Sequence, residues 1–108
     1  MIEAAPSVTH QQGLDPEDPP WRNITSYKTI QQNIQALFGK LYGGTFVEIG
    51  AQDGMWLSNT WWLESFRNWR GLLVEADPDN YLGLRLSPRL SPTLPACAVE
   101  GYSVKKVS

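Results

Sequence analysis

Residues 45–78 read TFVEIGAQDGMWLSNTWWLESFRNWRGLLVEADP. The run at 45–49 combines β-branched and aromatic residues and stops at Gly50, a pattern typical of a short strand followed by a tight turn. A second apolar run at 72–75 begins after Gly71 and predicts a second strand. Apolar residues at helical spacing lie between the two runs, so this stretch predicts strand, helix and strand in that order.

The predicted helix between the strands is rich in aromatic residues. Ser58 is expected to cap it, because a serine hydroxyl can accept a hydrogen bond from a free N–H of the first turn. The aromatic residues are Trp61, Trp62, Phe66 and Trp69. Their rings could form a stacking surface, but the helical spacing favours packing against the sheet. Trp56 would either fill a gap beside the turn or border a bound nucleoside.

A further helix is expected after the second strand, because Asp77 can cap its start and Pro78 suits the first turn, where its missing N–H costs nothing. Its apolar residues would be Tyr81, Leu82 and Leu84. The helix would end before three prolines that break regular structure, Pro88, Pro92 and Pro95. The apolar segment at 96–99 then predicts a third strand, and no pattern is visible after Gly101.

A helix is also expected before the first strand. From Ser26 onward, apolar residues recur at spacings that place them on one helical face: Tyr27, Ile30, Ile34, Leu37, Phe38 and Leu41. Thr25 or Ser26 would cap this helix of about four turns. Gly39 would adopt the left-handed turn near its end.

The chain is predicted to contain one small α/β domain. Residues 1–25 hold four prolines and no apolar period, so they are expected to form a disordered or extended arm, pinned at its end by Trp21 and Ile24. The domain would occupy residues 26–100, followed by an unstructured tail at 101–108. Strand, helix, strand, helix and strand form a βαβαβ unit, which is half of an open parallel sheet, with one helix in front of it.

Composition and charge argue against several classes of function. The 108-residue chain is 42% apolar and 19% charged, which is ordinary for a globular domain. Its net charge is -2 and its basic residues are scattered, which argues against nucleic acid as a partner. No apolar stretch is long enough to span a bilayer. The single Cys97 is expected to be a buried small hydrophobe, and His10 has no second metal ligand nearby.

Open α/β sheets bind ligands at the carboxyl ends of their strands, and two such ends in this sequence carry acidic residues. Residues 48–54 read EIGAQDG, and residues 74–78 read VEADP. Gly50 would let a ligand approach the backbone closely, because no Cβ stands in the way. Glu75 lies 25 residues after Gly50, and a carboxylate placed there can accept both hydroxyls of a ribose.

Each motif also has a simpler interpretation. Gly50 and Gly54 could only form a tight turn, and Glu75 could be a solvated charge at a strand end. Taken together, with a helix between them and this spacing, the two motifs favour a nucleoside cofactor.

These motifs resemble the FkbM-type family of S-adenosylmethionine-dependent methyltransferases. The likeness rests on residues 46–54, 57–60, 63–64, 69–78 and 80–81. It spans the region from residue 43 to residue 85, and within the family it is closest to the animal proteins related to Star.

The resemblance implies a partial Rossmann-like methyltransferase fold that binds S-adenosylmethionine. Glu48, Gly50 and Gly54 would form the first cofactor motif, and Glu75 would hold the ribose. The residues placed around the cofactor are Glu48, Gly50, Ala51, Gln52, Asp53, Gly54, Ser58, Asn59, Thr60, Glu75, Ala76 and Asp77. Gln52 stands where the general methyltransferase motif has its middle glycine. No catalytic residue and no methyl acceptor can be assigned.

Three functions remain open. In the family the domain continues through further strands, so the chain is expected to be its first part and inactive alone, with methyl transfer to oxygen carried out by the complete domain. The alternative is a non-catalytic role like that of Star, in export of growth-factor precursors from the endoplasmic reticulum to the Golgi, with secretory-pathway proteins as partners. The third is a truncated product without a stable function.

The compartment follows from the choice among these functions. It would be the cytoplasm for the chain as it stands, or the endoplasmic reticulum and Golgi for part of a longer Star-like protein. In the second case the triplet Asn23-Ile24-Thr25 fits the N-glycosylation pattern.

Overall fold

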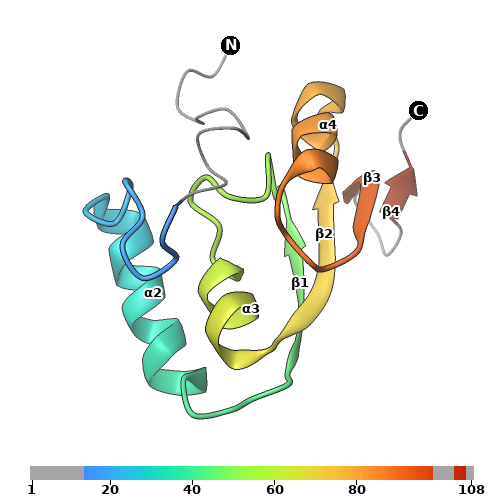
Figure 1. Ribbon diagram of the computed structural model, residues 1–108. Helices are drawn as coiled ribbons and strands as arrows, with labels where there is room; N and C mark the ends of the chain where they lie inside the picture. Colours follow the sequence, from blue (N-terminus) through green and yellow to red (C-terminus); the bar gives the residue numbers. More distant parts are fainter. Residues whose placement is uncertain (1–13, 99–103, 107–108) are drawn as a thin grey trace.

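Figure 1 shows the computed structural model of the chain, which describes residues 14–98 and 104–106. The part of the arm at 1–13 and the segments at 99–103 and 107–108, including His10, lie outside the described residues. In chain order the helices and strands are α2 (Thr25–Phe38), β1 (Thr45–Ile49), α3 (Trp61–Arg67), β2 (Arg70–Glu75), α4 (Pro78–Leu86), β3 (Thr93–Ala98) and β4 (Val104–Lys106).

The strands form one open sheet in the order β1-β2-β3-β4. β1 pairs with β2 in parallel, with Ile49 opposite Val74, and β2 pairs with β3 in parallel, with Glu75 opposite Pro95. Helices α3 and α4 connect these parallel strands. The expected α/β class, with three parallel strands and a helix in front of them, is therefore confirmed.

The carboxyl-terminal part of the sheet differs from the prediction. β3 begins at Thr93 rather than at Ala96, and it contains Pro95, which we expected to break regular structure. Proline is tolerated there because, among the described residues, β4 pairs with β3 only from Ala96 onward, so no described neighbour on that side needs an N–H from Pro95. The tail was expected to lack structure, but Val104–Lys106 pairs antiparallel with β3. Its three residues carry no strand pattern, so only this pairing defines it.

Helices α3 and α4 pack on the same face of the sheet. Phe46 of β1 packs against the cluster of Ala51, Leu73 and Leu84, and it also packs against the cluster of Trp62, Leu63 and Trp69. Leu84 belongs to α4, while Trp62 and Leu63 belong to α3. The two crossovers, from β1 to β2 and from β2 to β3, run in the same direction along the sheet, and parallel crossovers are right-handed, so α3 and α4 lie on the same face.

The tryptophans are core residues, as their spacing predicted. Trp61, Trp62 and Trp69 each expose 9% of their surface or less. Trp69 lies after α3 rather than inside it, because Asn68 adopts the left-handed conformation and ends the helix. Cys97 in β3 is half-buried rather than fully buried.

Only part of the predicted apolar face of α2 contacts the rest of the protein. Its buried residues are Tyr27 and Gln31, while Leu37 of the expected face is 71% exposed. Ile34 packs on the α3 side, so the contact stripe runs through positions 27, 31 and 34. Figure 1 shows α2 alongside α3, away from β2 and β3. The prediction failed because it assumed that every apolar residue of α2 faces the core.

The predicted ends of α2 were also wrong. Ile24 is the N-cap and no side chain caps the helix, so neither Thr25 nor Ser26 does so. Gly39 keeps a right-handed conformation with a φ of -64°. The left-handed turn comes later, at Gly43, where φ is 77°.

The end of the arm belongs to the core. Trp21 is 1% exposed and clusters with Tyr27, Met55 and Trp61. Pinning by Trp21 is confirmed, whereas Ile24 is 39% exposed and adds little. The ring of Trp56 lies 5.2 Å from that of Trp21, between centroids, so Trp56 packs against the end of the arm.

Candidate functional site

The carboxyl ends of β1 and β2 lie side by side (Figure 1). Because Ile49 is paired with Val74, the residues that follow them, Gly50 and Glu75, meet at the same edge of the sheet. The backbone N–H groups of Gly50 and Ala51 both donate to the carbonyl of Val74, at 2.8 and 2.9 Å. The two acidic motifs of the sequence are therefore brought together.

Glu75 ties the two strand ends to each other. One carboxylate oxygen accepts the N–H of Gln52 at 2.6 Å, and the other accepts the N–H of Asp77 at 2.9 Å. The residue is 7% exposed, so the interpretation as a solvated strand-end charge is wrong. A carboxylate offers about four lone-pair sites, which leaves about two of them available after these bonds.

The turn after β1 alternates in handedness. Gly50, Gln52 and Gly54 have φ values of 76°, 53° and 86°, in the region that glycine adopts most readily. A Cβ at Gly50 would meet no atom within 4 Å, whereas one at Gly54 would lie 2.8 Å from Leu84 of α4. Gly50 therefore faces open space beside the turn, and Gly54 is required for packing of the turn on α4.

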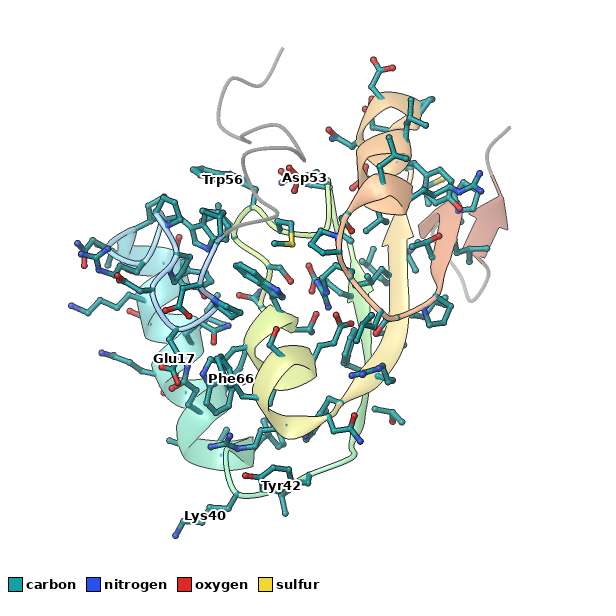
Figure 2. The ribbon with its side chains drawn as sticks, in the orientation of Figure 1. Glu17, Lys40, Tyr42, Asp53, Trp56 and Phe66 are labelled. Carbon is teal, nitrogen blue, oxygen red and sulfur yellow. The ribbon has the colours of Figure 1, made fainter. Side chains whose placement is uncertain are left out.

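Asp53 carries an unsatisfied carboxylate oxygen. Its Oδ1 accepts the N–H groups of Met55 and Trp56, both at 3.0 Å. Its Oδ2 is buried and has no hydrogen-bond partner among the described residues. Figure 2 shows Asp53 and Trp56 together at the carboxyl end of β1. A buried carboxylate oxygen without a partner is costly, and it marks a place where a donor from a ligand would be stabilising.

Glu48 points into the protein beneath the turn. Its Oε1 accepts hydrogen bonds from the hydroxyls of Ser58, at 2.9 Å, and Thr60. The prediction that Ser58 caps α3 is therefore wrong. Thr60 occupies the N-cap, and no side chain caps this helix. The backbone carbonyl of Asn59 accepts a hydrogen bond from the side-chain amide of Gln31 in α2, at 3.0 Å.

Arg89, between α4 and β3, was missed by the sequence analysis. Its Nε donates to Glu64 at 2.9 Å, and its Nη1 donates to the carbonyl of Gly54 at 2.8 Å and to the hydroxyl of Ser58 at 2.9 Å. Its Nη2 donates to the hydroxyl of Thr60 at 2.9 Å. The side chains of the Arg89–Glu64 ion pair are 1% and 4% exposed.

Glu64 is held by the loop that carries Arg89. It accepts the backbone N–H groups of Leu90 and Ser91, at 3.0 and 3.2 Å, and the hydroxyl of Ser91 at 2.6 Å. Burial alone would raise the pKa of Glu64, but the hydrogen bonds and the charge of Arg89, helped by Ser91 and Leu90, lower that pKa below its ordinary value. In the sequence, the only signal was a glutamate that directly follows the apolar run Trp61, Trp62 and Leu63.

The predicted site residues thus fall into separate groups. The strand-end group borders the turn and consists of Gly50, Gln52, Asp53, Glu75, Ala76 and Asp77. Ala51 is 1% exposed and belongs to the core. Asp77 caps α4 as predicted, since its side chain accepts the N–H of Asn80 at 2.9 Å.

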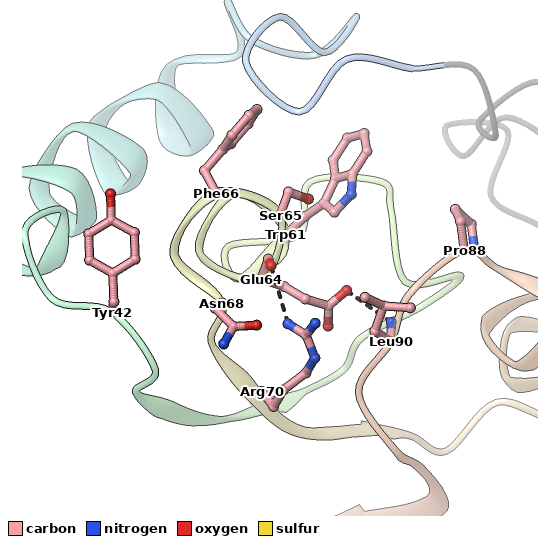
Figure 3. A pocket seen from close by; sticks show the side chains of 9 residues that line it. All are labelled: Tyr42, Trp61, Glu64, Ser65, Phe66, Asn68, Arg70, Pro88 and Leu90. Atoms are coloured by element: carbon pink, nitrogen blue, oxygen red, sulfur yellow. Dashed lines mark hydrogen bonds between the residues drawn. The ribbon is translucent and has the colours of Figure 1, made fainter.

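A cavity of about 310 Å³ lies away from these strand ends (Figure 3). It is lined by Tyr42, Trp61, Glu64, Ser65, Phe66, Asn68, Arg70, Pro88 and Leu90. Arg70, at the start of β2, donates there to the carbonyls of Glu64 at 3.3 Å and Trp69 at 2.7 Å. None of the predicted cofactor residues lines this cavity.

Comparison of the chain with protein-family models, with curated proteins and with solved structures found no match. Within residues 14–98 and 104–106, no helix is long and apolar enough to cross a membrane. The same residues contain no cluster of three or more His, Cys, Asp or Glu that could hold a metal ion.

Proposed function

We propose that this chain binds S-adenosylmethionine at the carboxyl ends of β1 and β2, as the first part of a Rossmann-like methyltransferase domain of the FkbM type. The observation that carries the proposal is the bond between the Glu75 carboxylate and the N–H of Gln52. It joins the acidic end of β2 to the glycine-containing turn after β1, and ligands of open parallel sheets bind where such strand ends meet.

The chemistry of the strand-end group fits the cofactor. The unused lone pairs of Glu75 can accept the two hydroxyls of the ribose. Asp53 Oδ2 lacks a donor, and the ammonium of the methionine part can supply one. Gly50 has open space where a side chain would stand, so a nucleoside can lie against the backbone. When bound, S-adenosylmethionine supplies a sulfonium-activated methyl group, and the complete domain would transfer it to oxygen.

A non-catalytic function, like that of the Star-related proteins, is the second candidate. It is favoured by one observation: Glu48 and Glu75 are already bonded within the protein, Glu48 to two hydroxyls and Glu75 to two backbone N–H groups. In this alternative the acidic residues only stabilise the turn, and partners in the secretory pathway would bind elsewhere. The two candidates differ in whether the cofactor binds.

Titration calorimetry of the 108-residue chain with S-adenosylmethionine tests the proposal. Glu75→Gln keeps the shape of the side chain but removes its charge, and charge-assisted hydrogen bonds contribute about 1.5–3 kcal/mol. We therefore expect roughly 10- to 100-fold weaker binding. Asp79→Asn is the matched control, because Asp79 is exposed on α4 and its change removes the same charge.

The outcomes separate the two candidates. Circular dichroism should be the same for the two variants and the unaltered chain. Equal affinity in Glu75→Gln and Asp79→Asn would remove Glu75 from the site. An unaltered chain that binds no S-adenosylmethionine, while melting cooperatively, would reject the proposal and favour the non-catalytic function.

A further inference from the structure

We infer that Arg89 is a positioning residue for the cofactor-binding turn, acting on residues 54–60 from the side opposite the proposed ligand. The inference rests on the proposed function, because it concerns the shape of the same site. Arg89 lies outside all the motifs that pointed to the cofactor, and its partner Glu64 was not among the residues expected to bind the cofactor.

The guanidinium of Arg89 contacts the segment at three separate points. It donates to the carbonyl of Gly54, the hydroxyl of Ser58 and the hydroxyl of Thr60, all at 2.8–2.9 Å. The fixed planar arrangement of its N–H donors means that these three acceptors have to lie in a defined geometry around it. A lysine ammonium has three donors at one point and cannot reach the same set.

Arg89 also sets the direction of the hydrogen bonds beneath the turn. A guanidinium only donates, so the hydroxyls of Ser58 and Thr60 must accept from it and use their own protons toward Glu48. Glu48 is in β1, at the base of the turn. The chain of bonds therefore runs from Arg89 through two hydroxyls to the strand that ends in the site.

Glu64 holds Arg89 in place. The Glu64 carboxylate accepts Nε of Arg89 and, at the same time, three donors from Leu90 and Ser91. Figure 3 shows this carboxylate directed toward Leu90. Because both partners are buried, the guanidinium cannot move without leaving charged groups unpaired.

The turn is thus fixed at two places. Glu75 holds Gln52 on the side of the proposed ligand, and Arg89 holds the segment from Gly54 to Thr60 on the other side. Between these places lies Asp53, whose buried Oδ2 has no hydrogen-bond partner among the described residues. Loss of Arg89 should leave β2 intact but let this segment change shape.

Two variants of the full 108-residue chain test the inference. Arg89→Lys keeps the positive charge opposite Glu64 but loses the planar set of donors. The double variant Glu64→Gln with Arg89→Gln removes both charges together, so no buried charge is left unpaired. Arg85→Lys and Arg85→Gln are the controls, because Arg85 is exposed on α4.

Two measurements are made on each variant: affinity for S-adenosylmethionine by calorimetry, and hydrogen exchange of individual amides by NMR. We expect cooperative melting in both variants, affinity at least 10-fold weaker than in the controls, and at least 10-fold faster exchange at residues 54–60. Amides of β2 should exchange as in the controls, which a general loss of stability would not allow.

Unchanged exchange at residues 54–60 together with unchanged affinity would overturn the inference. So would failure of both variants to melt cooperatively, because Arg89 would then be required for folding as a whole. If the unaltered chain binds no S-adenosylmethionine, the proposed function fails, and the exchange measurement alone still decides whether Arg89 positions the turn.

Discussion

Alternate residues of β1 point to opposite faces of the sheet, and the two faces have very different surroundings. On one face Phe46 packs against two core clusters that contain residues of α3 and α4, with the Arg89 guanidinium 5.8 Å from its ring centre, and Glu48 is hydrogen-bonded. On the other face Val47 and Ile49 are 65% and 59% exposed. Among the described residues β1 pairs only with β2, so it is an edge strand.

The comparison shows that an apolar residue in β1 does not necessarily contribute to the free energy of unfolding. Phe46, Val47 and Ile49 are all strongly apolar, as in a strand buried on both faces of a parallel sheet. Only Phe46 removes its side chain from water to a large extent, because α3 and α4 cover only that face. We therefore expect the stability of β1 to come from Phe46 and Glu48.

Truncating Phe46 on the covered face of β1 should have the largest effect on the free energy of unfolding. Phe46→Ala removes contacts with two clusters and should lower the free energy of unfolding by about 2 kcal/mol, less than a fully buried phenylalanine because Phe46 is half-buried. Val47→Ala on the exposed face should change it by less than about 0.5 kcal/mol. Urea unfolding of both variants measures the difference. Equal losses would mean that the exposed face of β1 is covered in solution.

Acid should weaken the covered face selectively. The pKa of Glu64 is lowered in the folded protein from its ordinary value of 4.5, so the folded state binds fewer protons there than the unfolded state as pH falls below that value. The stabilisation from Glu64 is present above about pH 4.5 and is lost as pH falls through the lowered pKa.

Urea unfolding between pH 7 and pH 3 measures this loss. Glu64→Gln should be less stable than the unaltered chain at pH 7, but its stability should fall less steeply toward pH 3. Glu17→Gln removes an exposed carboxylate and serves as the control. A slope in Glu64→Gln as steep as in the control would show that Glu64 is not the group responsible.

The smallest change in the free energy of unfolding is expected from substitutions in the turn after β1. Gln52 adopts a φ of 53°, which glycine tolerates better than glutamine. Gln52→Gly should therefore raise the free energy of unfolding by about 0.5 kcal/mol, despite the greater freedom of glycine in the unfolded chain. Gly50→Ala, at a φ of 76°, should lower it by about 1 kcal/mol. Thermal unfolding compares the two; a loss in Gln52→Gly would refute the strain argument.

Features set by neighbouring residues were predictable from the sequence. The short apolar runs gave β1 and β2 within two residues, and Asp77 followed by Pro78 gave the cap and the start of α4. The meeting of Gly50 with Glu75 was also predictable, because parallel pairing places successive strand ends at one edge.

Features set by distant residues were not predictable. The buried face of α2 depends on the position of α3, and β4 is defined only by its pairing with β3. Ser58 resembled a helix cap, since nothing nearby in the sequence shows that Glu48 and Arg89 both bond to its hydroxyl. The ion pair of Glu64 and Arg89 joins residues 25 positions apart, and neither charge has a local motif.

The bonds made by Arg89 have a consequence for biosynthesis. Arg89 follows Gly54 by 35 positions, so at about 5–20 residues per second the ribosome adds it roughly 2–7 s later. Near the end of that interval the nascent chain contains β1, α3 and β2, but the hydroxyls of Ser58 and Thr60 still lack their donor. The turn can therefore reach its final shape only after α4 has been synthesised, whatever the preferences of its own residues.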